Sequence, residues 1–267
     1  MLYSTFLAAV HVASIASVRA RGHSHTHFHK VRGINEVFAL GANNNPADVQ
    51  DGTGAGSDWY TTYSGDGSAA AGWPLMAQWV SFEDMVNANK GVMRVSCVNL
   101  GSDNGPDDSE DEIDLVLNAV QYVSYLTNVD HRFILAIVLQ ESKGCVRVRT
   151  TNNGVQNPGL MQAHDGAFSC NMEGNLQTPC PASQIFGMIF DGVGGTSTGD
   201  GLAKILNQLA SSGNDAQAYY RAARQYNTGS IAQDGDLDVG GHSTNCYASD
   251  VANRLTGWVW AETACSL

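Results

Sequence analysis

One carboxylic acid stands where the sequence predicts that a buried helix ends. Glu141 follows an apolar run, residues 133–139, and Asp130 can cap the start of that helix. Apolar surroundings and the partial negative charge of a helix C-terminus both disfavour a carboxylate, so we expect a raised pKa for Glu141. A carboxyl group that keeps its proton near neutral pH can protonate the leaving oxygen of a glycosidic bond. The alternative is an exposed Glu at a helix end with no chemical role.

Three short motifs follow one another in a specific order. They are Glu141-Ser142, then Gly-Leu-Met-Gln at residues 159–162, then Tyr-Asn-Thr-Gly at residues 226–229. In this order they resemble the motifs of soluble lytic transglycosylases and goose-type lysozymes, the family 23 type of glycoside hydrolase. The resemblance covers residues 118–260 and includes a last helix at residues 247–259, after the Tyr-Asn element. It implies a lysozyme-like helical fold and an enzyme that cleaves β-1,4-linked N-acetylated aminosugar polymers.

The resemblance also assigns roles to single residues. Glu141 is the general acid and the later base. Tyr226 matches a tyrosine that lies beside the acid and orients it, with Asn227 in support, although a buried Tyr with a bonded hydroxyl is the alternative. Ser142 matches a serine that faces the acid and the sugar, and the alternative is a residue that stiffens the loop. The other residues matched to the substrate cleft are Gly159, Met161, whose alternative is simple core, and Gln162.

A second carboxylate is missing from the loop that follows the acid. Residues 143–158 contain three basic residues but no Asp or Glu. Most glycosidases use a second acid as nucleophile or base, whereas the resembling lytic transglycosylases work with a single Glu and form a 1,6-anhydro sugar. Asp165 is the nearest later acid, and an exposed turn residue is its alternative role. Asp191 and Asp200 are the next candidates.

The elements that must position these residues are mainly helices. Helical spacing and capping residues predict helices over residues 81–88, 112–127, 184–190, 202–209, 215–226 and 249–260, besides the helix that carries Glu141. Apolar residues recur at three- and four-residue steps in the second of these, at Ile113, Val116, Leu117, Val120 and Val123. This face predicts packing against the helix of Glu141. The expected fold class is mainly α, a lysozyme-like helical domain with a loop-rich N-terminal extension, stabilised by disulfides.

The rest of the chain divides into three parts. Residues 1–20 contain an apolar stretch and end in small residues, which predicts a signal peptide cleaved near Ala20 and a secreted protein. Residues 21–32 hold four alternating histidines, for which we expect disorder or adventitious metal capture rather than a functional site. Residues 33–105 are rich in Gly, Asn, Asp and Ser and predict a loop-rich extension packed on the core. Residues 106–267 form the expected catalytic region.

Six cysteines form an even set, which predicts three disulfides and an oxidising compartment. The sequence singles out one pair, Cys170 with Cys180, because these residues flank a short loop with Gly174 and Pro179. A structural zinc site is the competing interpretation. No pair has the Cys-x-x-Cys spacing of such a site, so we expect no metal.

Charge limits the class of partner. The formal net charge is −12, and loss of Arg19 with the signal peptide leaves 13 basic against 26 acidic residues, or −13. Such a charge argues against nucleic acid, and no apolar run has the length of about 20 residues that a membrane span requires. An anionic bacterial wall repels this chain at neutral pH, which predicts an acid pH optimum. We expect a monomer that acts on a polysaccharide without a cofactor.

Peptidoglycan is favoured over chitin as the substrate, and two rival interpretations stay open. One is a chitinase, chitosanase or mannanase on the same fold, and the other is a wall-binding or host-interaction protein without catalysis. Four aromatic residues of the extension either line distal sugar subsites or form a small satellite core: Trp59, Tyr60, Tyr63 and Trp73.

Overall fold

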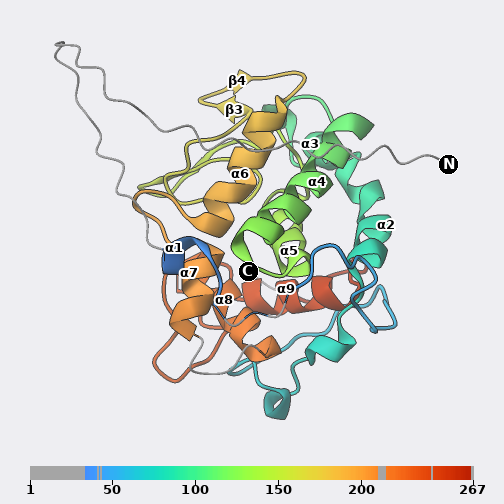
Figure 1. Ribbon diagram of the computed structural model, residues 1–267, viewed down its shortest axis with the longest axis vertical. Helices are drawn as coiled ribbons and strands as arrows, with labels where there is room; N and C mark the ends of the chain where they lie inside the picture. Colours follow the sequence, from blue (N-terminus) through green and yellow to red (C-terminus); the bar gives the residue numbers. More distant parts are fainter. Residues whose placement is uncertain (1–33, 41, 43, 210–214, 242, 266–267) are drawn as a thin grey trace. The chain divides into compact units, whose positions relative to one another are not determined.

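The computed structural model describes residues 34–40, 42, 44–209, 215–241 and 243–265. The predicted signal peptide, residues 1–20, and the His-rich segment, residues 21–32, lie outside this part of the chain. Within it the protein is mainly helical, with two short hairpins and three disulfides (Figure 1). The mainly α class predicted from the sequence is confirmed.

The described helices and strands have these bounds. The α-helices are α1 (Ile34–Val37), α2 (Phe82–Met93), α3 (Ser96–Asn99), α4 (Glu110–Thr127), α5 (His131–Ser142), α6 (Ala182–Gly194), α7 (Leu202–Leu209), α8 (Ala216–Thr228) and α9 (Tyr247–Thr256). Short 3-10 helices are η1 (Ala69–Ala71), η2 (Met76–Gln78) and η3 (Ser102–Asn104). Strands β1 (Thr151–Asn152) and β2 (Gln156–Asn157) pair antiparallel, as do β3 (Asn171–Met172) and β4 (Asn175–Leu176).

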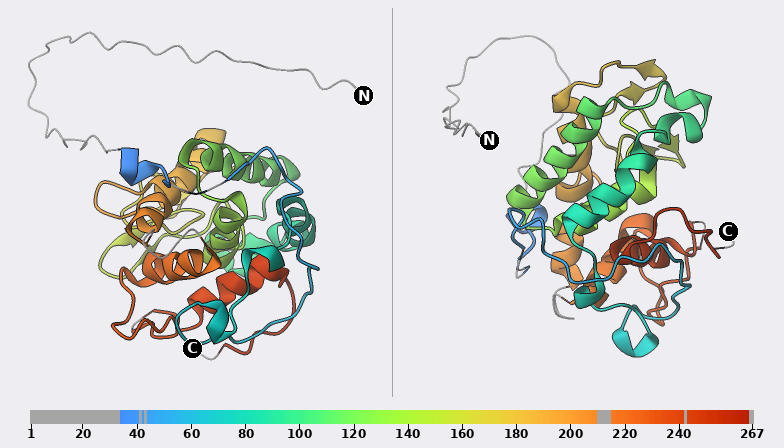
Figure 2. Two further views of the ribbon diagram at one scale, coloured as in Figure 1. Left: turned by 60° about the horizontal axis from the view of Figure 1, so that its bottom comes forward. Right: turned by 90° about the vertical axis from the view of Figure 1, so that its right-hand side faces the viewer.

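Helix α5 occupies the centre of this arrangement and packs against α4, α9 and α2 (Figures 1 and 2). Asp130 caps it, because the carboxylate accepts a hydrogen bond from the backbone N–H of Arg132 at 2.9 Å. Residues 133–139 are all fully buried, as expected for a helix that is apolar all round. The predicted buried helix is therefore confirmed, and Glu141 lies in its last turn.

Helix α4 packs against both α5 and α6. The face predicted from its spacing is buried, which confirms the packing against the helix of Glu141. The helix begins at Glu110, two residues before the predicted start, because Ser109 and Glu112 form a capping box in which each side chain bonds the other residue's backbone N–H.

Helices α7, α8 and α9 pack in sequence, α8 against both neighbours and α9 against α5. Helix α7 has the predicted bounds. Helix α8 begins one residue after the predicted start, because Asp215 is its cap, and the Asp215 carboxylate accepts a hydrogen bond from the N–H of Ala218. Helix α9 begins at Tyr247 and ends at Thr256. The start agrees with the helix at residues 247–259 that accompanies the resemblance, and it lies two residues before the start predicted from spacing, at residue 249. This earlier start brings Tyr247 to the side of α5.

Residues 44–80 contain only short helical turns and share the main hydrophobic core. Trp79 is fully buried and donates its indole N–H to the hydroxyl of Tyr220 in α8 at 2.8 Å. Trp73 is buried beside the same Tyr220, with ring centroids 5.1 Å apart. This segment thus supplies large aromatic side chains to the core beneath α8.

The disulfides join Cys97 to Cys145, Cys170 to Cys180 and Cys246 to Cys265. The three predicted bonds and the predicted pair Cys170–Cys180 are confirmed. Within the described residues, no helix is both long enough and apolar enough to cross a membrane.

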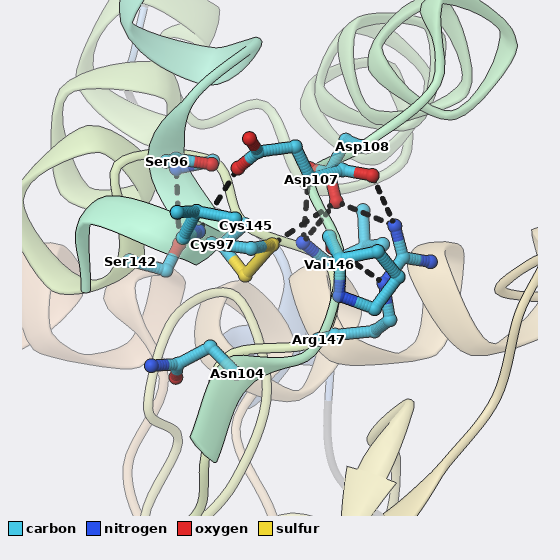
Figure 3. Close-up of a disulfide and its surroundings, with 12 residues drawn as sticks. Ser96, Cys97, Asn104, Asp107, Asp108, Ser142, Cys145, Val146 and Arg147 are labelled. Atoms are coloured by element: carbon cyan, nitrogen blue, oxygen red, sulfur yellow. Dashed lines mark hydrogen bonds and ion pairs between the residues drawn. A yellow bond between two sulfur atoms is a disulfide. The ribbon is translucent and has the colours of Figure 1, made fainter. Parts of the chain in front are cut away.

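A buried ion-pair cluster holds the loop that leaves α5. The Arg147 guanidinium is fully buried and pairs with Asp108 at 3.1 Å and with Glu112 at 2.5 Å. Figure 3 shows this guanidinium against Asp108, next to the disulfide of Cys97 and Cys145. Burial acts to raise the pKa of Glu112, but hydrogen bonds led by that from Arg147 hold the pKa at about 2. Arg147, one of the three basic residues in the loop after α5, is therefore engaged in ion pairs inside the protein.

Candidate active site

Glu141 leaves the core at the end of α5. The next residues, Ser142 and Lys143, end the helix, and Lys143 adopts the left-handed conformation with φ 55°. Because the apolar run before it is fully buried, the Glu141 carboxyl group lies at the boundary between core and solvent, half-buried. The helix thus presents a single acid at the edge of an apolar interior.

Tyr247 contacts this acid directly. Its hydroxyl donates a hydrogen bond to Glu141 Oε1 at 2.5 Å. Tyr247 is itself buried, at the first position of α9, and Cys246 before it is fixed by the disulfide to Cys265. No motif in the sequence points to Tyr247, and its only signal is its place at the start of the predicted helix at residues 247–259.

The environment of Glu141 changes its acidity in the predicted direction. Burial raises the pKa of Glu141 to about 7, while the hydrogen bond from Tyr247 and the charge of Lys143 act in the opposite direction. Burial also lowers the pKa of Lys143 to about 7. A carboxyl group with a pKa near 7 is protonated in about half of the molecules at neutral pH, so it can both donate and accept a proton.

Glu141 lines a cavity of about 760 Å³. The other walls come from the β1–β2 hairpin, the turn at Gln162, residues 198–200, the last turn of α8 and residues 243–244. Most lining side chains are hydroxyls and amides, and among the described residues the only acids on these walls are Glu141 and Asp200. Neutral donors and acceptors of this kind suit a ligand rich in hydroxyl and amide groups.

The turn at residues 159–162 forms one wall because of a glycine. Gly159 has φ +77°, and a Cβ there would lie 2.5 Å from Cγ of Met188 in α6. A side chain at this position would therefore clash with α6 and strain the backbone. The carbonyl of Gly159 accepts hydrogen bonds from the backbone N–H of Gln162 at 2.9 Å and from its amide Nε2 at 3.0 Å.

Gln162 lines the cavity, as expected from the resemblance. Its Oε1 accepts a hydrogen bond from the hydroxyl of Thr151 in β1 at 2.8 Å. Its Nε2 donates to the carbonyls of Gly159 and Arg149. The Gln162 amide therefore joins the turn to the β1–β2 hairpin and fixes the shape of this wall.

Met161 does not line the cavity, although the resemblance matches it to the substrate cleft. Its side chain is fully buried and packs on α6, where a Cβ at Gly192 would come 2.6 Å from the Met161 sulfur. The side chain thus belongs to the core, the alternative role that the sequence left open. Its backbone carbonyl accepts a hydrogen bond from the Tyr226 hydroxyl at 2.9 Å.

Tyr226 and Asn227 line the cavity together with Glu141. The Tyr226 hydroxyl, however, bonds to the Met161 carbonyl, while Tyr247 supplies the hydrogen bond to the acid. Asn227 Oδ1 accepts from Nη1 of the buried Arg224 at 3.1 Å. Tyr226 therefore fixes the turn at residues 159–162, and the direct orientation expected from Tyr226 comes from Tyr247.

Ser142 differs from the expectation that it faces the acid and the sugar. The residue is fully buried, and its Oγ lies 3.0 Å from the carbonyl of Val138 and 2.8 Å from that of Leu160. It also accepts a hydrogen bond from the N–H of Gly144 at 3.2 Å. Ser142 follows Glu141 in α5, and its side chain points into the core. Its hydrogen bonds therefore fix the loop after α5 and the turn at residues 159–162.

The candidate second acids occupy different places. Asp165 is exposed and accepts a hydrogen bond from the Thr198 hydroxyl at 3.0 Å. Asp191 accepts from the N–H of Ala167 at 2.7 Å. Asp200 lines the cavity and pairs with Lys204 at 2.7 Å. Of these three carboxylates, only Asp200 shares a wall of the cavity with Glu141.

The described residues offer two close groups of metal-type ligands, and each group is already bonded within the protein. In the first, the sulfurs of Cys97 and Cys145 near Asp108 form a disulfide. In the second, His131, Asp51 and Asp130 lie together, and the guanidinium of Arg132 contacts Asp51 at 3.0 Å and Asp130 at 2.7 Å. A cation already sits between the acids of the second group, so it is an ion-pair network.

Comparison with known proteins found no family model, no curated protein and no solved structure that matches this chain.

Proposed function

We propose that this protein is a secreted glycosidase or lytic transglycosylase that cleaves β-1,4-linked N-acetylated aminosugar polymers, with peptidoglycan the favoured substrate. The observation that carries the proposal is Glu141, one half-buried acid with a pKa of about 7 on the wall of a cavity lined by hydroxyls and amides. General acid catalysis of glycoside cleavage requires a carboxylic acid that is still protonated near the working pH.

The proposed roles of the residues follow from their contacts. Glu141 gives its proton to the glycosidic oxygen and then accepts one from the attacking hydroxyl. Tyr247 holds the carboxyl group through its hydrogen bond to Oε1. Gln162 and Asn227 both line the cavity. Asn227 offers its Nδ2 as a donor to the sugar, and Gln162 offers its Oε1 as an acceptor, because its Nε2 already bonds to Gly159 and Arg149. Tyr226 and Ser142 act indirectly, since both bond to the turn at residues 159–162.

The order of the motifs supports the lysozyme-like, transglycosylase-type assignment. In that type of enzyme a single Glu suffices, because the substrate supplies the second group and forms a 1,6-anhydro end. Asp200 is the alternative second group, as base or nucleophile in a hydrolysis.

Three disulfides support an oxidising compartment and therefore secretion. The net charge of −12 slows the approach to anionic walls at neutral pH, so activity on peptidoglycan should be favoured under acid conditions, where fewer carboxylates are ionised.

Mass spectrometry of digested polymers tests the proposal. Purified protein is incubated with peptidoglycan, chitin, chitosan and mannan, and the soluble products are analysed for new chain ends. The expected result is anhydro-ended fragments from peptidoglycan, and the control is the Glu141→Gln variant, which should release almost none. Ordinary reducing ends would indicate hydrolysis, and Asp200→Asn would then be compared with Asp165→Asn.

The same experiment separates the rivals. Products from chitin, chitosan or mannan but not from peptidoglycan would move the substrate to another polysaccharide. Binding to a polymer without products from any of the four would contradict the enzyme and favour a wall-binding protein.

A further inference from the structure

A second cavity, of about 380 Å³, lies beside the C-terminal half of α9. It shares no lining residue with the cavity of Glu141. Tyr247, which contacts Glu141, and Thr256, which lines the second cavity, are the first and last residues of α9. Nine steps of α-helix separate them by about 14 Å. One helix therefore connects the candidate active site to this second cavity.

The lining of the second cavity is neutral. Its polar side chains include Thr53, Ser57, Thr61, Gln78 and Asn253, and no charged side chain lines it among the described residues. No Leu, Ile, Val, Met or Phe lines it within the same part of the chain. An apolar peptide segment would find little hydrophobic surface here, and an ion would find no opposite charge.

One aromatic side chain at this cavity is largely exposed to solvent. Trp59 is 71% exposed, which is unusual for the largest side chain. The other three aromatic residues predicted from the sequence for distal subsites lie differently. Tyr60 and Trp73 are buried, and Tyr63 is half-buried against Trp73. Trp59 is therefore the one of the four that presents its ring to solvent.

The backbone around Trp59 is fixed. The carboxylate of Asp58 accepts hydrogen bonds from the N–H groups of Val259 at 2.8 Å, Trp260 at 2.9 Å and Ala261 at 3.1 Å. The exposed ring thus stands on a chain segment tied to the residues after α9. Because the backbone that carries it is already fixed, the indole has only its own side-chain torsions to order when a ligand covers it.

The walls of the cavity are fixed as well. On one side the N–H of Gly54 donates to the Trp79 carbonyl, and the Thr53 hydroxyl donates to the Ala77 carbonyl, both at 2.8 Å. On the other side the Asn253 amide exchanges two hydrogen bonds with the backbone of Thr61, at 2.7 and 2.8 Å. Because these bonds already exist in the free protein, the cavity is preformed.

We propose that this second cavity is an ancillary site for an uncharged N-acetylated sugar unit of a β-1,4-linked polymer, which stacks on Trp59. The apolar face of a pyranose ring covers the indole, and the ring hydroxyls and the acetamido group meet the neutral hydroxyls and amides of the walls. The choice of polymer rests on the proposed function. The site holds the insoluble polymer while its chain is cleaved at Glu141.

Binding of the polymer, rather than its cleavage, tests this proposal. All variants carry Glu141→Gln so that the polymer stays intact, and their retention on insoluble peptidoglycan and on chitin is measured by co-sedimentation. Trp59→Ala should weaken retention about tenfold, and Trp59→Tyr should restore most of it, since a tyrosine ring can also stack. Ala77→Glu keeps Trp59 but puts a charged side chain in the cavity, and it should weaken retention as well.

Trp260 provides the matched control. Its side chain is 62% exposed, and its backbone N–H donates a hydrogen bond to the same Asp58 carboxylate, yet Trp260 does not line the cavity. Trp260→Ala should stay within twofold of the parent. Equal loss in the two Trp→Ala variants, or retention of Trp59→Ala within twofold of the parent on both polymers, would overturn the proposal. A parent protein that neither polymer retains would overturn it too.

A second measurement reports on the site itself. In ¹⁵N-labelled Glu141→Gln protein, the indole N–H resonance of Trp59, identified by its loss in Trp59→Ala, should shift on titration with tri-N-acetylchitotriose. A shift at Trp260 and none at Trp59 would contradict the site. If retention depends on Trp59 but the parent cleaves no polymer, the proposed enzymatic function is contradicted and the proposed sugar site is supported. Cleavage with retention independent of Trp59 would remove only this site.

Discussion

The Tyr247 hydroxyl donates a hydrogen bond to Oε1 of Glu141 at 2.5 Å, and this bond joins the first residue of α9 to the last turn of α5. Burial raises the pKa of Glu141 to about 7, and this hydrogen bond acts against that rise. The bond also restricts the carboxyl group to one orientation at the cavity wall. Tyr247 thus positions the proposed acid and limits the rise of its pKa.

Tyr247→Phe should therefore change both the rate and its pH dependence. Loss of a hydrogen bond that favours the carboxylate raises the pKa of Glu141, so the alkaline limb of the pH–rate profile should move to higher pH. Turnover should fall about tenfold, on the order of one lost hydrogen bond. Steady-state rates from pH 4 to 9 on the best polymer measure both effects.

Tyr226→Phe is the control for this variant. The Tyr226 hydroxyl bonds to the Met161 carbonyl, so its loss should lower the free energy of unfolding by about 1 kcal/mol. Turnover should fall by tenfold or less, and the alkaline limb should stay in place. A shift of that limb in Tyr226→Phe but not in Tyr247→Phe would reverse the two roles.

The pH optimum of the parent protein should lie on the acid side. With a pKa of about 7, Glu141 loses its proton as the pH rises above neutrality, and the general acid is lost with it. Surface carboxylates also become more ionised with pH and strengthen the repulsion from anionic polymers. An optimum above pH 8 would contradict this assignment of the acid.

Glu141→Gln should alter the pH dependence of stability. The pKa of Glu141 is raised from its ordinary value of 4.5 to about 7, so the folded protein binds this proton more tightly than the unfolded chain. The resulting stabilisation is fully present below pH 4.5 and is lost as the pH rises through 7. The free energy of unfolding of the variant minus that of the parent should be about 3 kcal/mol larger at pH 8 than at pH 4. Urea unfolding at both pH values measures this, and an equal difference at the two would contradict the raised pKa.

Arg147→Met should destabilise the fold strongly. It leaves Asp108 and Glu112 buried without their guanidinium, and loss of one partner of a buried ion pair costs about 3–5 kcal/mol. Arg149→Met removes the same charge two residues on, where the side chain is 64% exposed and pairs with Asp103 only at 3.9 Å. That control should stay within about 0.5 kcal/mol of the parent in urea unfolding. Similar losses in both variants would contradict the structural role of the cluster.

Local sequence signals predicted the helices best where burial and capping agree. The run at residues 133–139 and its cap Asp130 defined α5, and the apolar spacing of α4 identified its buried face. Helix α2 extends five residues beyond the predicted end at residue 88, through Gly91 to Met93. Glycine has a low helix propensity, so the local sequence predicts an end before Gly91. Burial of Met93 in the core stabilises the longer helix.

The contacts of the site were harder to predict because they join distant segments. Tyr247 lies 106 residues after Glu141 in the chain, and its spacing within α9 gives no sign of that partner. Ser142 and Met161 stand beside cavity residues in the sequence, yet their side chains point into the core. Motifs thus identified the segments that meet at the cavity, while the packing of α5, α6 and α9 decided which side chains face it.

Glu141→Gln activity tests the central claim most directly. The substitution keeps the shape of the side chain but removes the transferable proton, and general acid catalysis contributes about a hundred- to ten-thousand-fold. With the fold verified by circular dichroism and polymer binding intact, turnover on the best polymer should fall at least about a hundredfold. A folded variant that still degrades this polymer at more than about a tenth of the parent rate would contradict Glu141 as the acid, and with it the proposed mechanism.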